Sequence, residues 1–152
     1  MLLCHFRPLV YPEDENLTVS TPEGRKILNN ISLDICSRER VALIGSNGSG
    51  KSTFIKTVLG EQDLPFTGDV LVGPSVIIGY LPQIINFPDG NQQLLEYFKN
   101  AVGINEQRAR QILSNFQFYK EDINKRVMNL SGGERMRVKL AELLQQKINT
   151  LI

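Results

Sequence analysis

One glycine-rich segment, Gly45-Ser-Asn-Gly-Ser-Gly-Lys-Ser52, has residue types and a spacing suited to holding a phosphate group. In the pattern G-x-x-x-x-G-K-S, backbone N–H groups surround phosphate oxygens, the lysine adds a positive charge and the serine hydroxyl binds Mg²⁺. The sequence therefore predicts a nucleotide-binding loop, with Lys51 at the β- and γ-phosphates and Ser52 on Mg²⁺. Its residues are Gly45, Ser46, Asn47, Gly48, Ser49, Gly50, Lys51, Ser52 and Thr53.

Two elements must position this loop. The apolar run 40–44 precedes it and predicts a buried strand, whereas 54–59 has helical spacing and is followed by Gly60, a suitable C-cap. A helix that begins at the loop turns its unpaired N–H groups and the positive end of its dipole toward the phosphates. The alternative is a glycine-rich turn that precedes a helix without binding anything.

A second stretch, Leu130-Ser-Gly-Gly-Glu134, has the same chemical character. Ser131 and Glu134 form an S-x-x-E capping box at the start of a helix, and Gly132 and Gly133 leave the N–H groups accessible. The N-terminus of such a helix attracts anions. A chain that binds one triphosphate does not need two such sites, unless the second serves the nucleotide of a neighbour. The alternative is a helix start with a flexible lead.

The remaining chain predicts short strands first and helices later. Residues 16–35 predict a hairpin that continues through Ile31, Leu33 and Ile35, and 70–72 with 76–78 predict a second strand pair. A last strand, expected to be buried on both faces, begins at 150. Residues 1–16, with Pro8, Pro12 and an acidic cluster, are expected to form a lead-in or linker.

Three helices are expected between these strands. The first begins near 91 with Leu94, Leu95, Phe98 and Val102 inward, and the second is capped by Asn105 with Ala109, Ile112, Leu113 and Phe116 inward. The third follows Ser131. Its predicted buried side chains are Met136, Leu140, Leu143 and Leu144, with Arg135, Lys139 and Glu142 outside.

Composition is that of an ordinary globular domain. The chain has 152 residues, a net charge of +1, 41% hydrophobic residues and 22% charged residues. The two cysteines, Cys4 and Cys36, lack metal-ligand spacing and indicate free thiols in a reducing compartment. We expect a cytoplasmic location, no signal peptide and no direct membrane insertion, because no run approaches the ~20 apolar residues of a membrane span.

These motifs together resemble those of the ATP-binding-cassette (ABC) ATPases. The glycine loop matches the Walker A motif, Gln83 in Tyr80-Leu-Pro-Gln83 matches the Q-loop, and 130–134 matches the signature motif. The resemblance implies ATP and Mg²⁺ as ligands and a head-to-tail dimer with a second ABC ATPase domain. Ser131, Gly132 and Gly133 would contact the partner's γ-phosphate, and Gln83 would be near Mg²⁺.

The implied fold is α/β. It has a P-loop NTPase core, an antiparallel β subdomain and a short α-helical subdomain at about 84–135, within an ABC ATPase domain that covers 17–152. Details such as Gly79-Tyr-Leu-Pro-Gln83 resemble the ABC-F branch, which is soluble and acts on ribosomes, so the ribosome or its RNA is the expected partner and DNA is not. A transporter subunit and a non-enzymatic remnant are the alternatives.

In the family, a strand like the one beginning at 150 leads to the Walker B aspartate and the catalytic glutamate. The chain ends at Ile152. From the sequence we therefore expect an ABC domain that is incomplete at its C-terminus, binds ATP and hydrolyses it poorly, with no residue assigned as catalytic.

Overall fold

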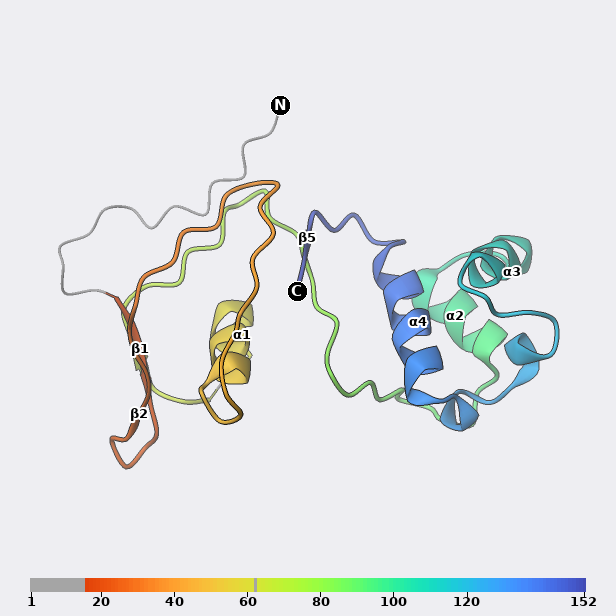
Figure 1. Ribbon diagram of the computed structural model, residues 1–152. Coiled ribbons are helices and arrows are strands. Elements are labelled where there is room, and N and C mark those ends of the chain that lie inside the picture. The colour runs from red at the N-terminus through yellow and green to blue at the C-terminus, as the bar shows by residue number, and fades with distance from the viewer. Residues whose placement is uncertain (1–15, 62) are drawn as a thin grey trace. The chain divides into compact units, whose positions relative to one another are not determined.

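The computed structural model describes residues 16–61 and 63–152, which fall into two compact units, one up to Val76 and one from Ile77 onward (Figure 1). Each unit is described separately below. The expected lead-in over 1–16 lies, except for Asn16, outside the described residues, as do Cys4, Pro8 and Pro12.

The first unit contains a small antiparallel sheet. Strand β1 (Leu17–Ser20) pairs with β2 (Lys26–Ile31) on one side and with β3 (Phe66–Thr67) on the other. Alternation along β1 buries Leu17 and Val19, which pack with Leu28 of β2. The predicted hairpin is therefore confirmed as far as Ile31. Beyond it the prediction was wrong, because the chain leaves the sheet and Leu33 is 42% exposed.

The predicted strand over 40–44 does not form. The backbone there is irregular, and Ile44 is 89% exposed. A strand is stabilised by pairing with a neighbour, and none of the described residues pairs with this segment. The strand predicted at 70–72 does not form for the same reason, and of the strand predicted at 76–78 only Ile78 is in a strand, β4 (Ile78–Gly79), whose partner is 150–151 and not 70–72. Leu71 and Val72 lie in an irregular stretch.

The second unit begins and ends with a short parallel pair. Strand β4 (Ile78–Gly79) pairs with β5 (Thr150–Leu151), which confirms the strand predicted at 150. The prediction that this strand is buried on both faces was wrong, since Leu151 is 52% exposed. Two strands alone leave side chains at an open edge.

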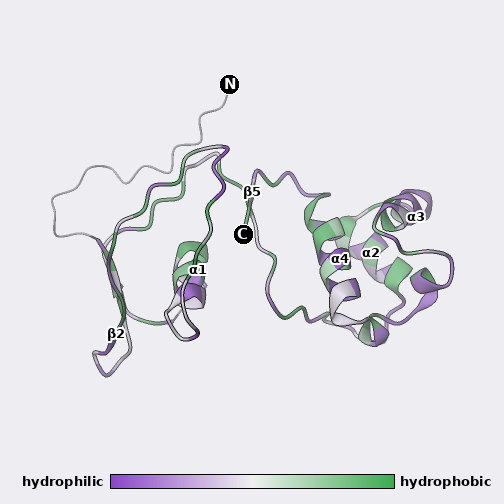
Figure 2. Cartoon of the chain, viewed as in Figure 1, coloured by the Kyte–Doolittle hydropathy of each residue, from purple (hydrophilic) through white to green (hydrophobic). Residues whose placement is uncertain are grey.

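Helices α2 (Leu94–Val102), α3 (Glu106–Asn115) and α4 (Gly132–Leu143) enclose the main core of this unit. Figure 2 shows hydrophobic segments in α2 and α4. Asn105 caps α3 as predicted, with its side chain accepting from the Arg108 N–H at 2.9 Å. The predicted inward faces of α2 and α3 are confirmed. The fully or nearly fully buried side chains are Leu94, Leu95, Phe98, Ala109, Ile112 and Leu113, and Val102 and Phe116 pack against them partly buried.

Two short 3₁₀ helices, η1 (Asp122–Asn124) and η2 (Val127–Asn129), lead from α3 to α4. This lead is hydrogen-bonded to the segment that enters α2. The N–H of Leu94 donates to the Lys125 carbonyl at 2.9 Å, and the N–H groups of Val127 and Met128 donate to the carbonyls of Gln92 and Gly90, each at 3.0 Å. The backbone before α4 is thereby fixed to the start of α2.

The predicted buried face of α4 was partly wrong. Val138, Ala141 and Leu143 are buried, whereas Leu144 is 53% exposed. Glu142, expected outside, is 8% exposed. Its carboxylate accepts from the Tyr97 hydroxyl at 3.0 Å and from the Lys139 ammonium at 2.9 Å. Because these partners satisfy its charge, burial of the carboxylate is tolerated.

In the part of the chain that the structure describes, no helix is long and apolar enough to cross a membrane.

Candidate functional site

Helix α1 (Lys51–Leu59) begins directly at the glycine loop. Its first residue is Lys51, earlier than the 54–59 expected from apolar spacing. Gly50 is its N-cap, with φ 91°, and Gly60 is its C-cap, with φ 69°. Both lie in the left-handed region, where glycine carries no Cβ penalty. The C-cap prediction at Gly60 is therefore confirmed.

The glycines of the loop serve different purposes. Gly48, with φ 80°, and Gly50 have positive φ values, whereas Gly45 does not. A Cβ at Gly45 would lie 2.6 Å from the Ser49 Oγ. A Cβ at Gly50 would lie 2.8 Å from the Leu28 Cδ2. The loop thus needs glycine both for its turn and for its close approach to β2.

The Lys51 side chain folds back over the loop. Its ammonium donates to the carbonyl oxygens of Gly45 at 2.8 Å and Ser46 at 2.7 Å, and it lies 3.5 Å from the Ser49 Oγ. The first turn of α1 contains no acidic residue. The Lys51 ammonium and the positive end of the helix dipole therefore both raise the electrostatic potential at the loop, and no carboxylate in the first turn of α1 offsets it.

The first N–H groups of α1 are directed toward the glycine loop, like the Lys51 ammonium. The bond from the Phe54 N–H to the Gly50 carbonyl, at 2.8 Å, is the first of the helical ladder. The N–H groups of Lys51, Ser52 and Thr53 therefore precede the ladder, as in any helix N-terminus. Donors of this kind, with a lysine beside them, suit phosphate oxygens.

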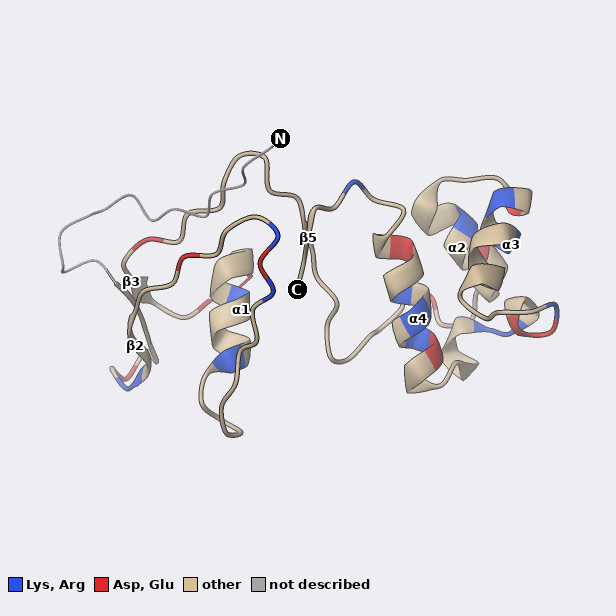
Figure 3. Cartoon of the chain, turned by 45° about the horizontal axis from the view of Figure 1, so that its top comes forward, with Lys and Arg blue, Asp and Glu red and all other residues tan. Residues whose placement is uncertain are grey.

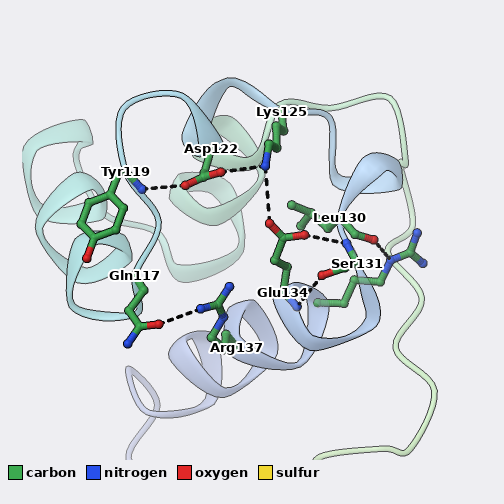
Figure 4. Close-up of polar contacts among 9 residues, drawn as sticks. Gln117, Tyr119, Asp122, Lys125, Leu130, Ser131, Glu134 and Arg137 are labelled. Atoms are coloured by element: carbon green, nitrogen blue, oxygen red, sulfur yellow. Dashed lines mark hydrogen bonds and ion pairs between the residues drawn. The ribbon is translucent and has the colours of Figure 1, made fainter.

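The start of α4 has the predicted capping box. Ser131 Oγ accepts from the Glu134 N–H at 3.3 Å, and Glu134 Oε2 accepts from the Ser131 N–H at 2.7 Å (Figure 4). Leu130 is buried and anchors this turn, whereas Ser131, Gly132 and Gly133 are exposed. A Cβ at either glycine would meet no atom within 4 Å. This helix N-terminus is held by the capping box and is open to solvent.

Hydrogen bonds from the Ser131 backbone and side chain, followed by the Lys125 ammonium, hold the pKa of the Glu134 carboxyl below its usual value. Lys125 Nζ lies 3.5 Å from Glu134 Oε1 and 2.7 Å from Asp122 Oδ1. Asp122 Oδ2 in turn accepts from the Tyr119 N–H at 3.1 Å. The carboxylate of the capping box is therefore ionised and has a cation beside it.

Sequence reasoning missed two side chains at this turn. Arg135 was expected to point outward, but its Nε donates to the Leu130 carbonyl at 3.0 Å and its Nη2 to the Met128 carbonyl at 2.8 Å. Lys125 lies outside the motif and was not assigned to this turn. The spacing of Asp122 and Lys125 signals an ion pair on a helical turn, whereas nothing in the sequence reveals that Glu134 joins it.

Gln83 lies exposed at a bend after β4. It belongs to the unit from Ile77 onward together with 130–134, whereas the glycine loop belongs to the other unit. Among the described residues, no group of three or more His, Cys, Asp or Glu side chains could hold a metal ion. The hydroxyl of Ser52 and the amide oxygen of Gln83 are hard oxygen donors of the type that Mg²⁺ takes alongside water and phosphate.

Replacing Ser131 with alanine removes one half of the capping box. We expect the free energy of unfolding of the second unit to fall by about 1 kcal/mol, the typical value of an N-cap. Urea denaturation followed by circular dichroism measures the change. Ser114→Ala, within α3, is the control. Its hydroxyl donates to the Gln111 carbonyl in the same helix, and alanine has the higher helix propensity, so an equal loss in both variants would contradict the capping role.

Glu134 also makes stability depend on pH. Because its folded-state pKa is lowered, it stabilises the native state above the pKa of the unfolded chain, and this contribution disappears as pH falls through the folded-state value. We expect Glu134→Gln to reduce the loss of stability below about pH 4.5, near the ordinary value for Glu. Melting curves at successive pH values measure this effect, and identical acid limbs in both proteins would contradict it.

Comparison with known proteins agrees with this geometry. Residues 28–152 match the family model described as ABC transporter. The chain is 36% identical over 146 residues to the zinc import ATP-binding protein ZnuC 1 of Hahella chejuensis, covering 95% of this chain and 54% of that protein. It is 35% identical over 145 residues to the energy-dependent translational throttle protein EttA of Haemophilus influenzae, covering 92% of this chain and 26% of that protein.

A solved structure of an ABC transporter ATP-binding protein from Pyrococcus furiosus superimposes with a TM-score of 0.64 at 24% identity, over 90% of this chain and 70% of that one. This likeness shows the fold and confirms the expected mixed α/β class. The chain spans 54% of ZnuC 1 and 26% of EttA. A glycine loop that carries Lys51, a capped helix start at Ser131 and a family match over 28–152 together show that the chain belongs to the ABC ATPase family.

Proposed function

We propose that the chain is the ATP-binding part of an ABC-F-type ATPase that acts on the ribosome. The observation that carries ATP binding is the Lys51 ammonium, held over the glycine loop at the N-terminus of α1. A lysine in this position neutralises β- and γ-phosphate charge, and the N–H groups of the loop and helix bind the oxygens.

The residues divide into two sets in this proposal. Residues 45–53 hold the triphosphate of the same chain, with the Ser52 hydroxyl toward Mg²⁺. Mg²⁺, when bound, neutralises charge on the β- and γ-oxygens. Leu130 and Glu134 fix the start of α4, so that Ser131, Gly132 and Gly133 present donors to the nucleotide of a second ABC domain in a head-to-tail dimer. The exposure of these three residues supports this role.

The ABC-F assignment rests on similarity. EttA is named for throttling translation, and Gly79 to Gln83 has the form seen in that branch. The second candidate is the ATPase subunit of a membrane transporter, which the comparable identity to the zinc import protein ZnuC 1 favours. Both candidates use the same nucleotide chemistry and differ in the partner.

Direct contact with ribosomal RNA through the helical region is a narrower part of the proposal. Several of its basic side chains are engaged within the chain. Lys99 pairs with Glu96 at 3.0 Å and Arg110 with Glu106 at 2.7 Å. On α4, acidic residues lie toward the two ends and basic residues lie between them (Figure 3). An RNA contact there would depend mainly on Lys120 and Arg126, which are exposed.

Two measurements test the proposal. Calorimetric titration with MgATP is expected to show saturable binding of one nucleotide per chain, and no detectable heat at millimolar nucleotide would contradict it. Co-sedimentation with ribosomes through a sucrose cushion is expected to require ATP. Absence of pelleting in ATP, combined with intact nucleotide binding, would contradict the ABC-F assignment and favour the transporter candidate.

A further inference from the structure

We propose that Lys125, held by Asp122, is a positioning residue that neutralises the Glu134 carboxylate so that the N-terminus of α4 can receive the phosphate of a second domain. This inference rests on the proposed function of residues 130–134. It assigns an electrostatic role to Lys125, a residue that lies outside 130–134.

The need arises from the capping box itself. Glu134 must be ionised and close to the helix start to accept from the Ser131 N–H at 2.7 Å. The same carboxylate lies in the first turn, where an incoming phosphate would approach the Ser131 hydroxyl and the glycine N–H groups. Two anions at one helix terminus repel each other. The capping box therefore stabilises α4 and, uncompensated, weakens anion binding there.

Lys125 is placed to remove that conflict. Its ammonium lies between the two carboxylates, 2.7 Å from Asp122 Oδ1 and 3.5 Å from Glu134 Oε1 (Figure 4). The backbone of Lys125 is fixed as well, because its carbonyl accepts from the Leu94 N–H at 2.9 Å and its N–H donates to the Asp122 carbonyl at 3.0 Å. The ammonium therefore reaches Glu134 from a fixed backbone.

Asp122 is held in place from its other side. Its Oδ2 accepts from the Tyr119 N–H at 3.1 Å. The hydrogen bonds from the Lys125 ammonium and the Tyr119 N–H lower the pKa of Asp122, and the charge of Arg137 adds to this effect. The Arg137 guanidinium lies 5.0 Å from the centre of the Phe118 ring and donates to Gln117 at 3.0 Å. Beside the start of α4, the carboxylates of Asp122 and Glu134 thus lie among three basic side chains, those of Lys125, Arg135 and Arg137.

The test uses charge compensation in the purified protein, with the ATP concentration at half-maximal dimerisation measured by analytical ultracentrifugation. Lys125→Met keeps the aliphatic stem and removes the charge, and we expect it to raise this concentration about fivefold, the order expected for one lost charge interaction near a surface. Lys125→Arg should match the wild type. Lys125→Met combined with Glu134→Gln should return the ATP concentration at half-maximal dimerisation to the wild-type value, because the glutamine oxygen still accepts from the Ser131 N–H without a charge.

Arg110→Met is the matched control, since Arg110 forms an exposed ion pair with Glu106 at 2.7 Å on α3. It should leave ATP-dependent dimerisation unchanged. The defect of Lys125→Met should also shrink as salt rises, since salt screens exposed charges. A purely structural role of Lys125 would give no rescue by Glu134→Gln and no salt dependence.

The outcomes separate the inference from the proposed function. A wild type that binds no ATP, or binds it without dimerising, overturns the proposed two-domain site and this inference with it. Normal ATP-dependent dimerisation of Lys125→Met, an equal defect in Arg110→Met, or a failed rescue in the double variant overturns the inference alone. If Lys125→Met does not fold, Glu134→Gln decides by itself: dimerisation at lower ATP supports the inference, and unchanged or weaker dimerisation overturns it.

Discussion

Replacing Lys51 with alanine is expected to weaken MgATP binding about 10- to 100-fold. The ammonium is the cation that folds over the glycine loop, within 2.8 Å of the Gly45 carbonyl and 2.7 Å of the Ser46 carbonyl. Hydrogen bonds from a charged group contribute about 1.5–3 kcal/mol, and each 1.4 kcal/mol corresponds to about a factor of ten in affinity. Calorimetric titration of the two proteins measures the difference.

The fold should survive this substitution. Lys51 bonds to carbonyl oxygens of exposed loop residues, so its removal leaves no buried group unsatisfied. The melting temperature without nucleotide should change little. Lys56→Ala is the control, because Lys56 is an exposed lysine in the last turn of the same helix. Equal loss of ATP affinity in the two variants would show that general charge, and not the position of Lys51, attracts the nucleotide.

Replacing Gly50 with alanine is expected to lower the free energy of unfolding of the first unit by about 2–5 kcal/mol. Gly50 has φ 91°, which costs a residue with a Cβ about 1–2 kcal/mol. The new Cβ would also lie 2.8 Å from the Leu28 Cδ2 and 3.3 Å from the Ile27 carbonyl oxygen. Overpacking of this kind costs about a further 1–3 kcal/mol, because the Leu28 side chain and the Ile27 carbonyl must both give way to the new Cβ.

Gly48→Ala separates the two contributions. Gly48 also has a positive φ, 80°, but a Cβ there meets nothing within 4 Å. It should cost only the conformational part, about 1–2 kcal/mol. Urea denaturation followed by circular dichroism gives both values. Equal destabilisation in the two variants would mean that contact between the loop and β2 contributes nothing.

Local sequence signals located three helix caps correctly, although α1 begins at Lys51 and not at 54 as expected. Asn105 and Ser131 were recognised as N-caps from residue type, and Gly60 as a C-cap, because capping depends on neighbours within a few residues. The strand predicted at 40–44 fails for the opposite reason. A strand needs hydrogen-bonding partners from elsewhere in the chain, and hydrophobicity alone does not supply them.

In the candidate site too, features that depend on neighbouring residues were predicted, and contacts between distant segments were not. Residues 45–53 and 130–134 were identified from contiguous motifs. Contacts between segments were not, including the pairing of Lys125 with Glu134 and the burial of Glu142 beside Tyr97. These contacts depend on which faces of the helices meet. The spacing of apolar residues on α4 is compatible with burial of either of two adjacent helix faces. The face that is buried contains Glu142, whose carboxylate has Tyr97 and Lys139 as partners.

The hydrogen bonds that join 90–94 to 125–128 also have a mechanical consequence. Three successive backbone hydrogen bonds join the two segments. Neither segment can therefore move lengthwise without breaking the bonds donated by Leu94, Val127 and Met128 together. A lengthwise displacement of residues 90–94 therefore acts directly on 125–128, the segment that leads into Leu130 and the start of α4.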